Sequence, residues 1–273
     1  MSVTLAPPLP DTLPEAARAE LARAVAQLED VSLAARFSSA LGTPIEALKN
    51  RLPASAQSLM EGAVKRALSK AMQAALRAQP SANPTPFSTA WFHRGMAAAT
   101  GAAGGAFGLP GTLMELPVST TLLLRQIAAV AEANGEDLAD PLIGAECLKV
   151  FAIGGRDTRD DGAEAGYFAV RIALAEVLKG AATRGVVGGL LPGFVGAIAA
   201  RFGGPVALKL SAQAVPVVGA AAGAAVNLAF LEHFRGVAEG HFTVRRLERL
   251  HGAVAVKAAY QELAQQRDAR FMG

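Results

Sequence analysis

The chain has 273 residues, of which 52% are hydrophobic and 18% are charged, and its formal net charge is +3. A chain of this length can bury a substantial core without a partner. Nucleic-acid binding would need clustered basic residues with stacking aromatics, and aromatics make up only 5% of the chain. We therefore expect no nucleic-acid partner, whereas the mild positive charge is compatible with an anionic membrane surface.

The N-terminal residues 1–14 contain four prolines and have neither a basic start nor a continuous apolar stretch. They are predicted to form a flexible leader rather than a signal peptide. Residues 15–54 are predicted to form accessory N-terminal helices, beginning with an Ala-rich amphipathic helix over Glu15 to Leu28. Cys147 is the only cysteine, which excludes an intramolecular disulfide and indicates a reducing, cytoplasmic location.

The segment from Ser55 to Ala78 has the clearest amphipathic pattern, with an apolar stripe at three- to four-residue spacing. Its polar face carries four basic residues: Lys65, Arg66, Lys70 and Arg77. Two interpretations stay open at this point. The face is either simply solvated, or it lies on anionic lipid headgroups at the inner face of the membrane.

Three uncharged stretches have roughly the length of a membrane span: Gly95 to Met114, Val186 to Ala200, and Leu210 to Leu231. Each contains a proline, and Gly and Ala drive membrane insertion only weakly. Such stretches favour either very close helix packing or conditional contact with a bilayer. A helical hairpin over residues 186–231 that spans the membrane is the integral alternative.

Glycines in the first stretch are spaced four apart, as Gly101 with Gly105 and Gly104 with Gly108. This spacing puts small residues on one helix face and lets another backbone approach closely. We expect all four at helix-helix contacts. The pattern fits neither a phosphate loop nor a dinucleotide fingerprint, so no cofactor is predicted.

The remaining segments also read as helices, because Ala and Leu recur with helical spacing and β-branched residues are sparse. Asp140 and Pro141 form a helix start, and a polar loop from Gly154 to Gly162 separates this helix from the next. The predicted fold is all-α, a single multi-helix bundle with close-packed Gly/Ala-rich helical hairpins. Its main domain is expected over residues 55–273.

Glu115 and Arg125 fall in a helix that is apolar on nearly all sides, so both are expected to be buried and to need partners. Ten residues separate them, about 15 Å along a helix, so they cannot pair directly. The candidate partners on other helices are Arg171, Asn227, His241 and Arg245. These residues form either a buried network that fixes helix docking or a ligand-binding or catalytic site.

A metal site is not expected. His233 and His241 are eight residues apart, about 12 Å along one helix, which is too far to share one ion. The chain contains no His-Glu-x-x-His motif and no glycine-flanked nucleophilic serine. No catalytic residue is therefore assigned.

Several motifs resemble the EcsC family of bacterial proteins. In the first half of the chain, these motifs are the glycine-rich run beginning at Gly101, the segment Glu115 to Thr121, and the segment Glu146 to Gly155. In the second half, they are Val215 to Ala220 and Gly240 to Arg249. The resemblance spans roughly Leu59 to Tyr260. It implies a single α-helical domain with membrane-linked biology, and it supplies no catalytic residue or cofactor.

The leading functional hypothesis is a peripheral membrane-associated or lipid-binding helical protein without catalytic activity, with a membrane surface or lipid as its partner. Basic residues on the Ser55 to Ala78 helix, together with Arg245, Arg246 and Arg249, would meet the headgroups. One alternative is a lipid-directed enzyme that uses Glu115 and His241 as acid-base groups and Arg125 to hold an anion. The sequence does not identify a ligand, a protein partner or an oligomeric state.

Overall fold

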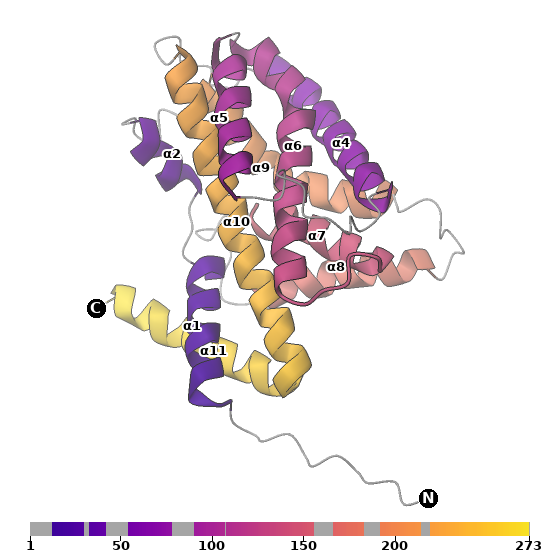
Figure 1. The fold of residues 1–273 in the computed structure, drawn as a ribbon, viewed down its shortest axis with the longest axis vertical. Helices are drawn as coiled ribbons and strands as arrows, with labels where there is room; N and C mark the ends of the chain where they lie inside the picture. The colour runs from indigo at the N-terminus through magenta and orange to yellow at the C-terminus, as the bar shows by residue number, and fades with distance from the viewer. Residues whose placement is uncertain are drawn as a thin grey trace, which may run out of the picture.

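The computed structural model describes residues 13–29, 33–41, 54–77, 90–106, 108–155, 166–182, 192–213 and 219–272, with only the backbone at some positions. These ranges contain ten helices and no strand, which confirms the all-α prediction. The helices, as labelled in Figure 1, are α1 (Glu15–Glu29), α2 (Leu33–Leu41), α4 (Ala54–Arg77), α5 (Ala90–Ala106), α6 (Gly108–Ala133), α7 (Pro141–Ile153), α8 (Tyr167–Ala182), α9 (Pro192–Gln213), α10 (Gly219–His251) and α11 (Ala253–Met272).

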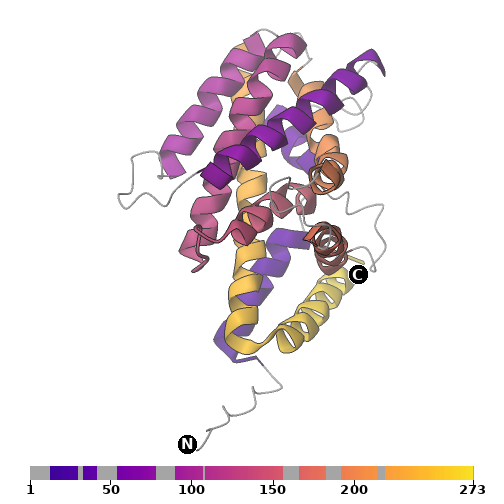
Figure 2. The same ribbon diagram turned by 90° about the vertical axis from the view of Figure 1, so that its right-hand side faces the viewer.

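The longest helix, α10, is the central element of the bundle. It has 33 residues, which corresponds to about 50 Å. It packs against α1, α2, α5, α6, α7, α9 and α11, and it runs through most of the height of the molecule in Figure 1. Arg249 and His251 in its last turn complement the helix dipole. Gly252 then adopts a φ of 88°, and the chain turns back into α11 (Figure 2).

An aromatic cluster joins α10 to α7 and α9. Phe151 on α7, Phe202 on α9 and Phe230 and Phe234 on α10 are almost fully buried. Their ring centroids lie 4.8 to 6.0 Å apart, in tilted and edge-to-face arrangements. Because aromatics are scarce in this chain, gathering four of them here concentrates much of the large-side-chain packing where three helices meet.

The first helix, expected to be accessory, packs closely on α10 and α11. A Cβ at Gly240 would lie 2.8 Å from Leu28 Cγ and 3.0 Å from the Ala24 carbonyl oxygen, so only glycine lets the two helices approach this far. Arg246 also pairs with Glu20 at 2.7 Å. In these contacts α1 is an integral layer of the bundle.

The predicted apolar stretches only partly match the helices. The stretch from Gly95 to Met114 is divided, because α5 ends at Ala106 and α6 begins at Gly108. Within the described residues, two segments are long and apolar enough to cross a membrane by length and composition alone, Leu113–Ala133 of α6 and Gly193–Ala212 of α9. Core helices of soluble proteins pass the same test. Residues 183–191 and 214–218 of the predicted hairpin lie outside the described part of the chain.

Most of the described glycines fall into two groups. In the first group, glycine is required by close contact: a Cβ at Gly101 of α5 would lie 2.3 Å from the Gly223 carbonyl oxygen of α10, and one at Gly155 would lie 2.3 Å from the Arg201 carbonyl oxygen. In the second group, a Cβ would meet no described atom within 4 Å, as at Gly196 on α9. The surroundings of Gly104, Gly105 and Gly108 lie outside the described residues.

Replacing Gly101 by Ala is expected to destabilise the protein by about 1 to 3 kcal/mol, because the added methyl group would force α5 away from the backbone of α10. Gly236→Ala is the matched control: its added methyl group meets nothing within 4 Å, and alanine favours a helix interior by up to about 1 kcal/mol. Urea denaturation monitored by circular dichroism measures both effects. Equal stability of the two variants would contradict the close α5-α10 contact.

Candidate functional site

The first polar cluster lies where α5, α6, α9 and α10 meet. Lys209 of α9 donates to Glu115 Oε2 at 2.8 Å and to Ser119 Oγ at 3.2 Å. Asn227 of α10 donates from Nδ2 to the other oxygen of Glu115, Oε1, at 3.0 Å. The same Nδ2 lies 2.8 Å from the Ala97 carbonyl oxygen and 3.0 Å from the Thr100 hydroxyl oxygen. Lys209 and Asn227 are 0% and 2% exposed. The cluster therefore connects four helices inside the core.

Glu115 is ionised in this cluster. Burial alone would raise the pKa of its carboxyl group, but the charge of Lys209 and the hydrogen bonds from Lys209 and Asn227 lower the pKa below its ordinary value. The Lys209 ammonium also lies 5.2 Å from the centroid of the Phe230 ring. Both charges are thus compensated locally, which is what burial of an ion pair requires.

The second polar cluster surrounds His241, further along α10. The Tyr167 hydroxyl lies 2.9 Å from His241 Nδ1, and His241 Nε2 lies 3.3 Å from Glu146 Oε2, without the alignment of a hydrogen bond. Burial lowers the pKa of His241 despite the nearby carboxylate, so the ring is neutral. With Nε2–H facing Glu146, the neutral ring accepts a hydrogen bond from the Tyr167 hydroxyl at Nδ1.

Ion pairs surround this histidine. Lys149 donates to Glu146 Oε1 at 2.7 Å, and Arg245 Nη1 lies 3.5 Å from Glu146 Oε2. Burial would raise the pKa of Glu146, but His241, Lys149 and Arg245 lower it well below its ordinary value. Two further pairs continue the network outward: Arg171 with Glu248, through two hydrogen bonds of 2.8 and 2.9 Å, and Arg245 with Glu136, through hydrogen bonds of 2.8 and 3.2 Å.

The six predicted site residues therefore separate into groups. Glu115 and Asn227 belong to the first cluster, while Arg171, His241 and Arg245 belong to the second. The expectation that Arg125 is buried was wrong: its side chain is exposed, because it lies on the outward face of α6. Asn227 and His241 are 14 residues apart on α10, about 21 Å along the helix. Glu115, His241 and Arg125 thus do not form the joint acid-base site of the enzyme alternative.

Sequence reasoning missed three residues that complete these clusters. Lys209 is the buried cation of the first cluster, and Glu146 and Tyr167 complete the second. Lys209 carried a usable signal, since it is one of only two charged residues between Pro192 and Gln213. A lone lysine in a long apolar helix needs an acidic partner, and Glu115 was the matching lone acid in the first half of α6.

The two histidines of α10, His233 and His241, make contacts with different groups. His233 Nε2 lies 2.7 Å from the Gly154 carbonyl oxygen and donates to it, and burial lowers the pKa of this histidine to about 4. Gly154 must lack a side chain here, because a Cβ would lie 2.6 Å from the Phe234 ring. Among the described residues, no group of three or more His, Cys, Asp or Glu side chains could hold a metal ion.

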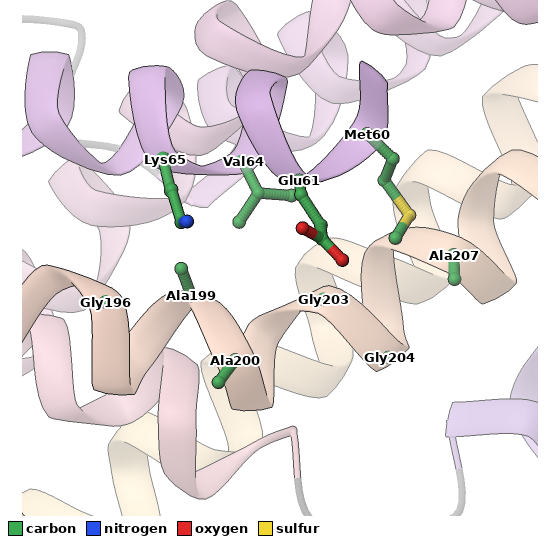
Figure 3. A pocket seen from close by; sticks show the side chains of 10 residues that line it. All are labelled: Met60, Glu61, Val64, Lys65, Gly196, Ala199, Ala200, Gly203, Gly204 and Ala207. Atoms are coloured by element: carbon green, nitrogen blue, oxygen red, sulfur yellow. The ribbon is translucent and has the colours of Figure 1, made fainter. Parts of the chain in front are cut away.

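A groove between α4 and α9 is the open candidate site. It has a volume of about 480 Å³, and Figure 3 shows α4 side chains facing a floor of Gly and Ala on α9. The α4 wall consists of Met60, Glu61, Val64 and Lys65; the α9 floor consists of Gly196, Ala199, Ala200, Gly203, Gly204 and Ala207. Unlike the two buried clusters, this groove is accessible to a ligand.

Three of the four predicted membrane-facing basic residues, Lys65, Arg66 and Lys70, have exposed side chains on α4. Arg77 is the last residue of α4, and its side chain lies outside the described part. Arg245, by contrast, is directed into the second cluster. Arg246 and Arg249 are also engaged, by Glu20 and Glu136.

Replacing Lys209 by Met is expected to destabilise the fold by about 3 to 5 kcal/mol, because Glu115 would remain as an uncompensated buried charge. The double variant Glu115→Gln/Lys209→Met should recover part of this loss, since the neutral amide needs no cation. Urea denaturation of the two single variants and the double variant gives the coupling energy. A double variant that loses the sum of both single effects would contradict the buried pair.

Stability should fall as pH decreases from about 6.5 towards 4. The unfolded chain protonates His233 near its ordinary pKa of about 6.5, whereas the folded chain resists protonation until about 4, so the unfolded state binds more protons in this window. The slope is about 1.4 kcal/mol per pH unit for one histidine. Chemical denaturation of His233→Gln, whose amide can still donate to Gly154, should show a smaller slope than the parent protein. An unchanged slope would contradict a neutral, buried His233.

Comparison with known proteins gives one match. The profile of the EcsC protein family matches residues 15–247, so it starts where α1 begins rather than near Leu59. No curated protein and no solved structure matches the chain. The matched region includes both polar clusters and both walls of the groove. The chain belongs to the EcsC protein family.

Proposed function

We propose that this protein associates peripherally with anionic membrane surfaces, through the face on which α4 lies across α6 and α9. The observation that carries this proposal is the coincidence of two features on one face. α4 carries exposed basic side chains, and it packs on the two helices that contain the long apolar segments (Figure 2). A surface that is both basic and apolar is what an interfacial protein needs.

The apolar component comes from helices that the bundle covers incompletely. Only 50% of the α6 segment and 44% of the α9 segment are buried. Met114 and Val118 on α6 are 82% and 47% exposed, and Leu59 on α4 is 61% exposed. These side chains are available to enter the boundary between headgroups and acyl chains.

The basic component comes from Lys65, Arg66 and Lys70. None of these side chains makes an ion pair with another residue in the described ranges, so their charges are free to meet phosphate groups. Each basic residue near an anionic leaflet contributes about 1 kcal/mol of binding. The cytoplasmic leaflet is the negatively charged one, which agrees with a cytoplasmic location at the inner face of the membrane.

The buried clusters have a supporting role in this proposal. Their charges are compensated inside the bundle and stabilise its helix contacts. The proposal assigns them no catalytic step, and lipid contact is assigned to the outer face alone.

Reversing Lys65, Arg66 and Lys70 to Glu is expected to weaken binding to anionic vesicles by at least about 3 kcal/mol, because three attractive charges become repulsive. Co-sedimentation with vesicles of phosphatidylglycerol and phosphatidylcholine measures binding at low and near-physiological salt. The loss should be larger at low salt, where screening is weaker.

The matched control reverses three exposed basic residues on helices other than α4, α6 and α9, namely Arg23 on α1, Arg36 on α2 and Lys257 on α11. This control has the same net charge as the first variant, so a loss in both would indicate a general charge effect. The proposal would be contradicted if the wild-type protein bound anionic and zwitterionic vesicles equally well. Equal sedimentation of the wild type and the α4 charge variant would also contradict it.

A further inference from the structure

We infer that the groove between α4 and α9 binds one acyl chain of an aminophospholipid, with the lipid phosphate at Lys65 and its ammonium group at Glu61. This inference rests on the membrane association proposed above and identifies the lipid class that the same face would hold. The groove is the accessible hollow on this face, and α4 carries both its basic residues and the polar wall of the groove (Figure 3).

The glycines of α9 supply the first argument. Gly196, Gly203 and Gly204 lie inside a 22-residue helix, where each glycine costs about 1 kcal/mol relative to alanine. A Cβ at any of these positions would meet no described atom within 4 Å, in contrast to the tightly packed Gly101 and Gly155. Helix packing within the described chain therefore does not require these glycines. What they do provide is a flat floor beneath the groove.

The shape and lining of the groove supply the second argument. Its volume of about 480 Å³ lies within the usual range of small-molecule sites, about 300 to 1,000 Å³. Apolar contacts come from both walls, with Met60 and Val64 above and Ala199, Ala200 and Ala207 below. The lining on α9 extends from Gly196 to Ala207, about 17 Å along the helix, so an extended hydrocarbon chain fits along it. The Gly/Ala floor has no large side chain that would select for a branched or ring-shaped ligand.

The two charged residues of the wall supply the third argument. Glu61 and Lys65 are one helical turn apart, a spacing at which Glu and Lys commonly pair. They form no ion pair here, and Figure 3 shows both side chains extending from α4 towards α9. Two opposite charges that pair with no other described residue, at one edge of an apolar groove, complement a headgroup that carries both a phosphate and an ammonium group. A purely anionic headgroup would meet Lys65 but be repelled by Glu61.

The test uses the full-length protein and vesicles of palmitoyl-oleoyl phosphatidylethanolamine and phosphatidylglycerol. After incubation, the protein is separated from the vesicles and native mass spectrometry identifies the retained lipid. The vesicles contain the two lipids in equal amounts, and the expected result is one phospholipid per chain, with at least threefold more phosphatidylethanolamine than phosphatidylglycerol retained. Glu61→Gln should abolish this enrichment, and Lys65→Gln should reduce retention of either lipid.

The groove is tested directly by Gly196→Leu/Gly204→Leu, which fills the floor and should reduce retained lipid at least tenfold. Gly193→Leu is the matched control on the same helix, since Gly193 does not line the groove and has open space around it. Ala200→Phe is a second blocking variant in case the double leucine variant does not fold. Both blocking variants should still sediment with anionic vesicles, which separates this inference from the proposed surface association.

Absence of retained lipid in the wild type, or equal retention in the blocking variants and Gly193→Leu, would overturn the inference. Equal retention of the two headgroups by the wild type would overturn the assignment of Glu61. The α4 charge variant also changes Lys65 of the groove, so the groove is judged from the glycine, Ala200 and Glu61 variants, which leave the basic residues of α4 intact.

Discussion

The buried contact between Lys209 and Glu115 is the interaction on which the arrangement of the bundle depends. It fixes α9 against α6, and Asn227 extends it to α10 and α5. A buried charge without its partner is strongly unfavourable, so the four helices can dock only in a register that brings these side chains together. The aromatic cluster around Phe202 and Phe234 adds non-directional packing to the same helices. The ion pair therefore supplies specificity, and the rings supply much of the buried area.

The position of α9 in turn determines the outer face. With Lys209 directed inward, the opposite side of α9 presents Gly196, Ala200 and Gly204 towards α4. Large side chains at these positions would close the space between the two helices. The first polar cluster and the groove thus lie on opposite sides of α9. A rotation of α9 about its axis would disturb both together.

The sequence predicted the fold class and several helices, because Ala/Leu periodicity and the Asp140-Pro141 helix start are local signals. It also named two residues of the first cluster, Glu115 and Asn227, but not the cation between α9 and α6, Lys209. It failed for Arg125, since an apolar helix does not reveal which of its sides is covered. It also placed Glu115 and His241 in one candidate site, whereas they lie in separate clusters. Which side chains meet across helices depends on how the helices are aligned, and no local sequence pattern encodes that alignment. The groove could not be predicted either, because its glycines resemble packing glycines in sequence and differ only in what surrounds them.

For the membrane association proposed above, the same ion pair favours a peripheral over an integral mode. A charged residue at the centre of a bilayer costs about 2.5 to 3.5 kcal/mol even on the lenient insertion scales. α9 contains Arg201 and Lys209, and the apolar segment of α6 contains Glu115, Arg125 and Glu132. Moving either helix into lipid alone would break the pair between them, and moving α9 would also remove Phe202 from its aromatic neighbours. The lower-energy arrangement keeps both helices in the bundle and uses only their uncovered sides at the interface. In the proposed mode of membrane association, α6 and α9 would contact the membrane in their half-buried state, without a preceding unfolding step.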